Sequence, residues 1–257
     1  MTDLAGKGQR ALVTGASRGI GLELARLLAA DGYALTLVAR SAALLEALAS
    51  ELGGARALAI DLAEPGAVAQ VVAAAPAVDV VVNNAGVGDF GPFAETDPAK
   101  TAGMLQLNIG ALTELTRAYL PGMLERGHGR VLNVASTAAF QAGPLMAVYY
   151  ATKAYVLSFS EAVAEEVRGS GVTVTALCPG PTASGFQAGA AMETSKLVKG
   201  RNLPDAATVA RAGYKAMQRG DVVEVVGLAN KVQTTAVRFT PRSVLRRLVH
   251  RAQQADH

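Results

Sequence analysis

Two adjacent tyrosines, Tyr149 and Tyr150, lie in the stretch "MAVYYATKAYVLSF" at residues 146–159, and Lys153 follows them within one helical turn. Residues three or four apart on a helix are neighbours, so the Lys153 ammonium can approach either phenol. A free tyrosine has a pKa of about 10, and a nearby ammonium favours the phenolate and lowers that pKa. The spacing therefore predicts a tyrosine that exchanges protons near neutral pH, as a general acid or base does. It leaves open which tyrosine acts, and a surface pair without chemistry is the alternative.

The glycine-rich stretch "TGASRGIG", at residues 14–21, is a second group of residues that could support chemistry. It follows a short apolar run and opens a helical one. Glycines allow a tight turn and the close approach of a pyrophosphate, which then lies at the helix N-terminus. The spacing is GxxxGxG rather than GxGxxG, but the same physics applies. We therefore predict a dinucleotide-binding turn, with an ordinary tight turn as the alternative.

The next apolar run ends in Ala39 and Arg40, where a fold that selects NAD places an acidic residue for the ribose hydroxyls. Arg18 lies in the glycine-rich turn. Two guanidinium groups near the adenosine ribose favour a 2′-phosphate. The sequence therefore predicts that NADP(H) is preferred over NAD(H); two solvated surface arginines are the alternative.

Strand-like and helical runs alternate along the chain, which indicates a parallel sheet covered on both faces. We predict an α/β fold: a single doubly wound Rossmann-type domain over residues 1–257, with a mostly parallel sheet of about seven strands and helices on both faces. Residues 180–203 lack a clean period and are expected to form a substrate flap beyond the carboxyl end of a strand. The strand-like runs are residues 10–15, 34–40, 56–62, 78–86, 129–136, 172–180 and 221–227.

Half of the 257 residues are apolar (51%) and 18% are charged, so the chain can bury a large core. The single cysteine, Cys178, ends an apolar run and is expected to be a buried small residue rather than a nucleophile. The N-terminal stretch has no apolar signal core, and no run reaches 18 uncharged apolar residues. We therefore expect a soluble, cytoplasmic protein without an integral membrane segment. No Cys/His/Asp cluster suggests a bound metal.

The basic residues gather at the end of the chain. The net charge is only +3, and no motif or interleaved aromatic residue points to a nucleic-acid partner. Residues 238–257 hold five arginines and one aspartate, however, which gives this part a charge of +4. The basic C-terminal tail, residues 230–257, is expected to be the solvated face of a terminal helix. Contact with a membrane surface or an acidic partner is the alternative.

Taken together and in order, these motifs resemble the short-chain dehydrogenases/reductases. The resemblance runs from about Gln9 to about Val226 and rests on "TGASRGIG", "NNAG" at residues 83–86, Asn108, Ser136, Tyr149-x-x-x-Lys153 and "PG" at residues 179–180. The stretches "GVGDFGPF" and "MAVYYATKAYVLSFSEAVAEEV" are similar to a bacterial group described as ketoacyl-reductase-like or DltE-like.

The resemblance implies a Ser–Tyr–Lys catalytic site supported by Asn108, and it selects Tyr149, because Lys153 is four residues after it and Ser136 thirteen before it. Tyr149 is then the general acid/base, and Ser136 donates a hydrogen bond to the substrate oxygen. Lys153 also contacts the nicotinamide ribose, and Asn108 holds a water in a proton relay.

The resemblance also implies the cofactor contacts. Asp61 and Leu62 are expected against the adenine, and the "NNAG" turn helps to shape the cofactor wall. Ser184 stands where the family often has a Thr that binds the nicotinamide amide, and Tyr150 replaces a residue that is usually small. The expected cofactor-binding residues are Gly15, Ser17, Arg18, Gly19, Ile20, Gly21, Arg40, Asp61, Leu62, Asn84, Ala85, Gly86, Tyr149, Lys153, Pro179, Gly180, Thr182 and Ser184.

The sequence thus predicts an NADP(H)-dependent oxidoreductase, a carbonyl reductase or alcohol dehydrogenase that interconverts a ketone and a secondary alcohol. Apolar flap residues (Phe186, Met192, Leu197 and Val198) favour an apolar or acyl-type small-molecule substrate. The resemblance implies a homodimer or homotetramer that pairs through two long helices. The alternative function is a non-catalytic dinucleotide-binding sensor or scaffold protein.

Overall fold

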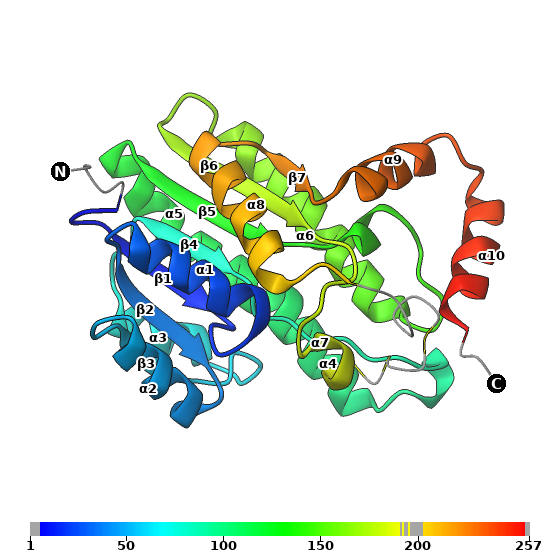
Figure 1. Ribbon diagram of the computed structural model, residues 1–257, viewed down its shortest axis with the longest axis horizontal. Helices are drawn as coiled ribbons and strands as arrows, with labels where there is room; N and C mark the ends of the chain where they lie inside the picture. The colour runs from blue at the N-terminus through cyan, green and yellow to red at the C-terminus, as the bar shows by residue number, and fades with distance from the viewer. Residues whose placement is uncertain (1–5, 191, 193–194, 196–202, 255–257) are drawn as a thin grey trace.

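The computed structural model of the chain describes residues 6–190, 192, 195 and 203–254. Seven strands form a single sheet in the order β3-β2-β1-β4-β5-β6-β7, and every neighbouring pair is parallel (Figure 1). This confirms the predicted doubly wound α/β fold and its seven strand-like runs. The strands are β1 (Arg10–Thr14), β2 (Ala34–Ala39), β3 (Arg56–Ala59), β4 (Val80–Asn83), β5 (Gly129–Val134), β6 (Val172–Cys178) and β7 (Val223–Val225).

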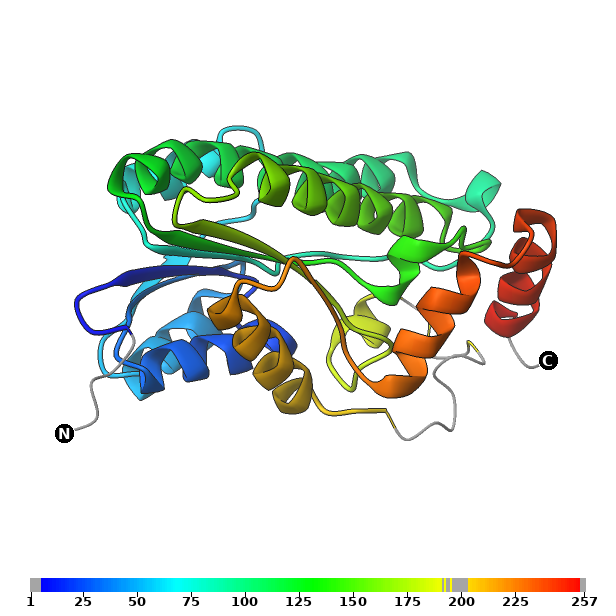
Figure 2. The ribbon, with the colours of Figure 1, turned by 90° about the horizontal axis from the view of Figure 1, so that it is seen from above.

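Helices cover both faces of the sheet, as the view from above in Figure 2 shows. One layer contains α1 (Gly19–Ala30), α2 (Ala42–Glu51) and α8 (Ala206–Arg219). The opposite layer contains α3 (Ala67–Ala74), α5 (Leu112–Arg126) and α6 (Ala147–Glu166). Strand order reverses between β1 and β4, and open α/β sheets bind ligands beyond the carboxyl ends of the strands at such a point.

The central strands are apolar on both sides because both faces of the sheet are buried. In β4, Val80 and Val82 pack with α1, α2 and α8, while Val81 packs with α3, α5 and α6. All three side chains are fully buried. Successive side chains of a strand point to opposite faces, so a strand between two helical layers needs a continuous apolar run.

Local signals place some of the helix ends. Asp97 caps α4 (Pro98–Leu105): its carboxylate accepts a hydrogen bond from the Ala99 amide at 2.8 Å. This cap, which satisfies an amide without a partner inside the helix, is what the Asp97-Pro98 pair predicts. Ser41 lies at the N-cap position of α2, but its side chain makes no capping hydrogen bond.

The end of the chain forms two helices, α9 (Leu228–Val237) and α10 (Arg242–Gln253), at the end of the molecule opposite β3 and α2 (Figures 1 and 2). Within the predicted flap, the structure shows a short helix, α7 (Phe186–Gly189). Leu197 and Val198 lie outside the described residues. In the described part of the chain, no helix combines the length and apolar character needed to cross a membrane.

Candidate active site

The predicted catalytic residues come from three elements that meet beyond the carboxyl ends of β4 and β5. Ser136 follows β5 and begins a short 3-10 helix, η3 (Thr137–Phe140). Tyr149 and Lys153 lie one turn apart on α6. Asn108 lies on a π-helical segment, η2 (Gln106–Ala111), between α4 and α5. Residues from separate parts of the sequence therefore converge on one location.

Tyr149 is partly buried and interacts with Ser136. Burial raises the pKa of the Tyr149 phenol above its usual value, and the hydrogen bond with Ser136 opposes this rise. Ser136 Oγ is itself positioned by two backbone contacts: it accepts from Ala138 N at 3.1 Å and lies 3.4 Å from the Pro179 carbonyl oxygen. The Tyr149 ring packs against the Phe186 ring, and the two ring centroids are 5.2 Å apart.

Lys153 is buried, and its ammonium donates a hydrogen bond to the Val134 carbonyl oxygen at 2.7 Å. Its Nζ lies 5.8 Å from the centroid of the Tyr149 ring. Burial lowers the pKa of Lys153 to about 8. The prediction that Lys153 lowers the pKa of Tyr149 is wrong for this structure, because the burial of the phenol outweighs any effect of the ammonium. The Tyr149 phenol is therefore protonated at neutral pH.

The Asn108 side chain is fully held by the protein. Its Oδ1 accepts from Val87 N at 2.9 Å, and its Nδ2 donates to Val87 O at 2.9 Å and to Thr152 Oγ1 at 3.0 Å. Gly86 lies between the two polar groups of the site, since an added Cβ would be 3.2 Å from Asn108 Oδ1 and 3.5 Å from Lys153 Nζ. Asn108 thus fixes the loop after β4 against α6.

The turn between β1 and α1 has the features of a phosphate-binding loop. Gly15 and Gly19 have positive φ angles of 64° and 58°, which side-chain-bearing residues rarely adopt. The helix begins at Gly19 and, within the described residues, no side chain caps its first amides. Free amides at a helix N-terminus bind anions, so the turn fits the pyrophosphate of a dinucleotide. Ser17 and Ile20, also predicted to bind the cofactor, lie in this turn and are partly exposed.

Asn84 ties this turn to the strand next to it. Its Nδ2 donates to Thr14 O at 3.0 Å and to Gly15 O at 3.2 Å. The Thr14 hydroxyl accepts from the amides of Asn84 and Ala85, each at 3.0 Å. Asn84, Ala85 and Gly86 therefore lie beside the glycine-rich turn, as a cofactor wall requires, and Asn84 also holds the turn in shape.

Gly21 fits this arrangement because it has no side chain. An added Cβ would collide with the Gly15 carbonyl oxygen and Asn84 Nδ2. We expect Gly21→Ala to lower the free energy of unfolding by roughly 1–3 kcal/mol, as overpacking does. Urea unfolding measures this. Gly103→Ala, in α4 with open space around the Cβ position, is the matched control and should be neutral or stabilising. If Gly21→Ala and Gly103→Ala changed the free energy of unfolding equally, the predicted collision at Gly21 would be wrong.

At the end of β2, Arg40 is exposed and lies 3.8 Å from the Asp61 carboxylate. Arg18 is exposed in the glycine-rich turn, and Leu62 is buried beside Asp61. No acidic residue follows β2, so the carboxylate nearest to Arg40 comes from the loop after β3. The loops after β1, β2 and β3 thus bring together the residues predicted for the adenosine end of the cofactor.

The loop after β6 crosses the glycine-rich turn. A Cβ on Gly19 would lie 3.1 Å from Ser184 Cβ, so the two loops are in close contact. Thr182 is buried, and its hydroxyl donates to Gly180 O at 2.9 Å, while Pro179 O accepts from Thr137 N at 2.8 Å. Ser184 therefore lies against the glycine-rich turn, and Pro179, Gly180 and Thr182, which precede it in this loop, remain predicted cofactor contacts.

A feature that the sequence did not reveal is the contact between Tyr150 and α10. Tyr150 is buried, and its hydroxyl accepts a hydrogen bond from Gln253 Nε2 at 2.5 Å. The two residues are 103 positions apart, so no local pattern could connect them. Tyr150 belongs to an apolar cluster beside Tyr149. Its members are Ala138, Met146, Tyr150, Ala190, Met192 and Val249, with Phe90, Phe186 and Leu245 partly buried against them.

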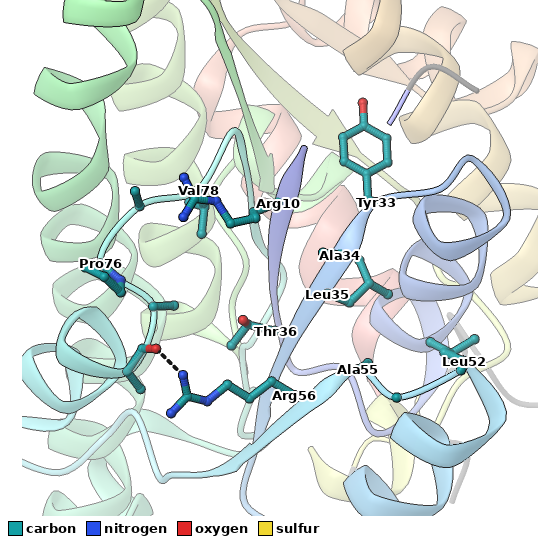
Figure 3. Close-up of a pocket in the computed structure, with 15 residues that line it drawn as sticks. Arg10, Tyr33, Ala34, Leu35, Thr36, Leu52, Ala55, Arg56, Pro76 and Val78 are labelled. Atoms are coloured by element: carbon teal, nitrogen blue, oxygen red, sulfur yellow. Dashed lines mark hydrogen bonds between the residues drawn. The ribbon is translucent and has the colours of Figure 1, made fainter. Parts of the chain in front are cut away.

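Cys178 and a remote hollow do not contribute to this site. Burial raises the pKa of the Cys178 thiol to about 12, so it is not a thiolate nucleophile at neutral pH. A hollow of about 530 Å³ is lined by Arg10, Tyr33, Thr36 and Arg56, among others. Figure 3 shows these residues as sticks. These residues lie at the amino ends of β1 to β3, which is the edge opposite to Tyr149.

Comparisons with known proteins agree with this geometry. The family model described as "short chain dehydrogenase" matches residues 9–194. "Ketoacyl reductase HetN" from Nostoc sp. is 37% identical over 188 residues, which cover 70% of this chain and 65% of the relative. A "Very-long-chain 3-oxoacyl-CoA reductase" from Laccaria bicolor is 36% identical, covering 65% of this chain and 53% of the relative. The chain therefore spans just under two thirds of the one and about half of the other.

A solved structure is similar over almost the whole length. The "Short-chain dehydrogenase from Sphingobium yanoikuyae in complex with NADPH" superposes with a TM-score of 0.81 at 29% identity, covering 96% of this chain and 99% of that one. The similarity extends beyond the segment that the family model matches, into α8, α9 and α10.

Proposed function

Because the chain belongs to the short-chain dehydrogenase/reductase family, we propose that it is an NADP(H)-dependent oxidoreductase that interconverts a ketone and a secondary alcohol. The observation that carries this proposal is the convergence of Ser136, Tyr149 and Lys153 beside a phosphate-binding turn. A non-catalytic dinucleotide sensor does not need a partly buried tyrosine that interacts with a serine and lies one helical turn from a buried lysine.

In this proposal, bound NADPH supplies the hydride, and the protein supplies the proton and holds the substrate. Tyr149 donates its phenolic proton to the oxygen of the carbonyl as negative charge develops there. The phenol is protonated at neutral pH, as a proton donor must be, although burial raises its pKa and so makes it a weaker acid. Ser136 donates a hydrogen bond to the same oxygen and stabilises its charge in the transition state.

Lys153 and Asn108 are assigned different tasks. The buried Lys153 ammonium faces the loop that holds Gly86, where the nicotinamide ribose is expected to bind. Both ends of the Asn108 amide are engaged by Val87 and Thr152, so we assign its side chain a positioning role.

The apolar cluster next to Tyr149 supports a substrate of apolar or acyl type. Phe90, Phe186 and Leu245 are partly exposed there, and Met146 and Met192 lie behind them. Such a wall stabilises hydrocarbon by removing it from water, and it offers few partners for the hydroxyls of a sugar. Two relatives named as ketoacyl or 3-oxoacyl reductases support the same class. A screen of NADPH oxidation with acyl ketones and sugar ketones tests this; turnover of sugars alone would contradict it.

Arg40 is proposed to select NADP(H). Its guanidinium is exposed, and its 3.8 Å contact with Asp61 is loose enough to leave it available to a 2′-phosphate. We expect Arg40→Ala to weaken NADPH binding roughly 10- to 100-fold, which corresponds to one charge-assisted hydrogen bond, and to leave NADH binding nearly unchanged.

Fluorescence titration of both cofactors measures the effect of Arg40→Ala. Arg168→Ala removes an equally exposed arginine at the end of α6 and serves as the control. A wild-type preference for NADH, or an equal loss of both cofactors in Arg40→Ala, would contradict the proposed role.

Three further parts of the sequence-based interpretation also stand as proposals. We propose that residues 1–257 form one domain with residues 180–203 as its substrate flap, and that the protein is cytoplasmic. We also propose a homodimer or homotetramer formed through α5 and α6. Tyr155, on the outer face of α6, is exposed and stacks on Phe159 with ring centroids 5.7 Å apart, which provides apolar area for such an interface.

A further inference from the structure

Charge is strongly segregated in this protein. Residues 225–254 contain six Lys and Arg side chains and no Asp or Glu. The other residues hold 18 cations and 21 anions, a net charge of −3. Figures 1 and 2 show that α9 and α10, which carry these cations, lie together at one end of the molecule. The fold therefore places a cationic end on a slightly acidic body.

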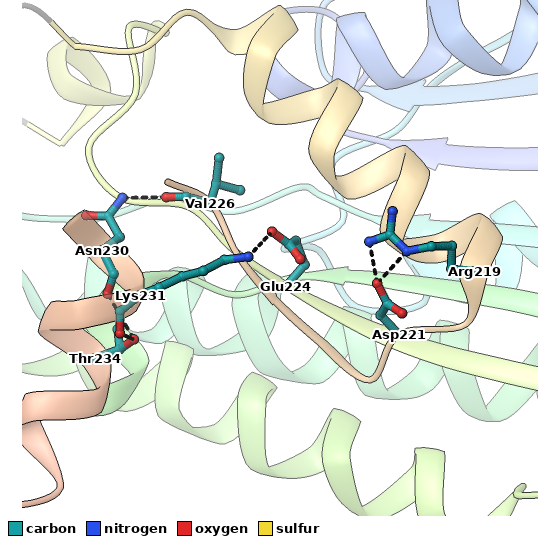
Figure 4. Close-up of polar contacts among 7 residues, drawn as sticks. All are labelled: Arg219, Asp221, Glu224, Val226, Asn230, Lys231 and Thr234. Atoms are coloured by element: carbon teal, nitrogen blue, oxygen red, sulfur yellow. Dashed lines mark hydrogen bonds and ion pairs between the residues drawn. The ribbon is translucent and has the colours of Figure 1, made fainter. Parts of the chain in front are cut away.

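The inner side of α9 is fixed to the sheet by polar contacts (Figure 4). Asn230 Nδ2 donates to Val226 O at 2.7 Å, and Lys231 Nζ forms an ion pair with Glu224 at 3.1 Å. Thr234 is buried on the same side. These contacts determine which face of α9 points outward.

The outward face of α9 is apolar. Leu228 and Val232, four residues apart, are 79% and 62% exposed, and Phe239, just after the helix, is 84% exposed. A spacing of four residues keeps Leu228 and Val232 on one side of the helix, and Phe239 follows in the turn after it. Large apolar side chains exposed in a row are uncommon unless they contact another surface.

α10 lies beside α9 at this end of the molecule (Figures 1 and 2). Its inner face, with Leu245, Val249 and Gln253, packs against the apolar cluster beside Tyr149. Its outer face exposes Val244 (47%) and Leu248 (52%). Five exposed arginines accompany these apolar residues, and none of them forms an ion pair within the described part of the chain; they are Arg238, Arg242, Arg246, Arg247 and Arg251.

We propose that α9 and α10 form a docking surface for an anionic lipid bilayer. Interfacial helices bind bilayers by burying apolar side chains among the lipid head groups while Lys and Arg pair with the phosphates. Here the exposed side chains Leu228, Val232, Phe239, Val244 and Leu248 supply the apolar contact, and the five arginines supply the charge.

A lipid surface fits this end of the molecule better than a protein partner does. In a symmetric contact with a second copy, the same patch faces itself, so two clusters of five arginines would repel each other. An acidic protein would pair with the arginines, but it would need a pocket for each of five apolar side chains spread over two helices. A bilayer accepts those side chains at any position.

Docking would place the substrate site next to the bilayer. The inner face of α10 contacts Tyr150, the neighbour of Tyr149, through the Gln253 hydrogen bond of 2.5 Å. Gln253 is fully buried, and its Oε1 has no hydrogen-bond partner in the described residues. One helix therefore presents arginines to the lipid on one side and lines the apolar cluster on the other.

The test is co-sedimentation of the full-length protein with vesicles of phosphatidylcholine alone and of phosphatidylcholine with roughly a quarter phosphatidylglycerol. We expect binding to the anionic vesicles that weakens as salt is raised. The combined variant Arg246→Gln, Arg247→Gln and Arg251→Gln should lose roughly a hundredfold in affinity, about fivefold per arginine. The variant with Arg117→Gln, Arg168→Gln and Lys215→Gln removes three exposed cations from the body and should bind normally.

A second pair of variants tests the contribution of the exposed apolar side chains to vesicle binding. Phe239→Ser should weaken binding roughly tenfold, because the ring no longer enters the interface. Phe93→Ser, which replaces a phenylalanine that is 64% exposed on the body, should not. Both residues are exposed, so neither change threatens folding, and NADPH binding verifies that the variants are native.

Several results would overturn the proposal. The first is that the protein does not bind anionic vesicles at low salt. The second is that it binds both vesicle types equally well. The third is that the variants in the body and those in α9 and α10 lose the same amount of vesicle affinity. Binding to polyglutamate without binding to vesicles would identify an acidic protein as the partner instead. Dissociation of an oligomer by Phe239→Ser, seen by sedimentation equilibrium, together with no vesicle binding would show that a second copy covers this face.

Discussion

Replacing Tyr149 by Phe is expected to lower kcat roughly a thousandfold and to leave the Kd for NADPH within a fewfold of the wild type. The change removes one hydroxyl, which is the proposed proton donor to the substrate oxygen, and general acid catalysis contributes about 10²–10⁴ in rate. The ring remains and keeps its 5.2 Å contact with Phe186, so packing of the site is preserved. Steady-state kinetics with the best ketone from the screen and fluorescence titration of NADPH give the two numbers.

Tyr150→Phe is the matched control, because it removes the same atom from the neighbouring residue. The Tyr150 hydroxyl is bonded to Gln253 on α10, and it is not the group that interacts with Ser136. We expect its loss to lower stability by roughly 1–3 kcal/mol, since the fully buried Gln253 amide loses its partner, and to change kcat only a fewfold. A thousandfold loss of kcat in Tyr150→Phe with normal turnover in Tyr149→Phe would reverse the assignment of the two tyrosines.

The parts of the site that were predictable from sequence depend on short spacings. Tyr149 and Lys153 are one helical turn apart, and the glycine-rich turn lies between one strand and one helix, so local patterns contain them completely. The seven strands and their parallel pairing followed from the alternation of strand-like and helical runs. The interacting residues of the site are close in sequence. The pairing of the strands follows a rule that holds for parallel α/β sheets in general.

What could not be predicted depends on residues far apart in the chain. Thr14 and Asn84, 70 positions apart, hold the glycine-rich turn, and Gln253 reaches Tyr150 across 103 positions. A basic C-terminal run was visible, but its inner face against the substrate site was not. The pKa of Tyr149 was misjudged for the same reason, because burial comes from elements that surround the residue and not from its spacing to Lys153.

The second large effect concerns Lys153, and it links stability to catalysis. Burial lowers the pKa of this ammonium from 10.5 to about 8. Between these two pH values, the unfolded chain holds the proton and the folded protein does not, so stability rises with pH across this window. Below about pH 8 both states are protonated, and the folded state carries the full cost of a buried charge, about 3 kcal/mol.

Lys153→Met should remove this dependence on pH. We expect the free energy of unfolding of the variant, relative to the wild type, to fall by about 3 kcal/mol as the pH rises from about 8 to 10.5. Urea unfolding of both proteins at each pH measures the difference. Comparison at the same pH is needed because Cys178 and Tyr119, whose pKa values burial raises to about 12, reduce stability in alkali in both proteins. Lys215→Met, at an exposed position on α8, controls for the change in net charge.

The same variant should lose turnover by roughly a thousandfold, because the ammonium that orients the cofactor ribose beside Tyr149 is gone. A variant that is more stable at neutral pH and inactive would show why a costly buried cation is present. The 2.7 Å hydrogen bond from Lys153 to the Val134 carbonyl oxygen offsets part of the cost of burying the charge. The remaining cost lowers the free energy of unfolding, and the protein tolerates it because the ammonium is needed for activity. A stability difference that does not change with pH would show that the Lys153 pKa is not depressed. Full activity in Lys153→Met would show that the buried ammonium has no catalytic purpose.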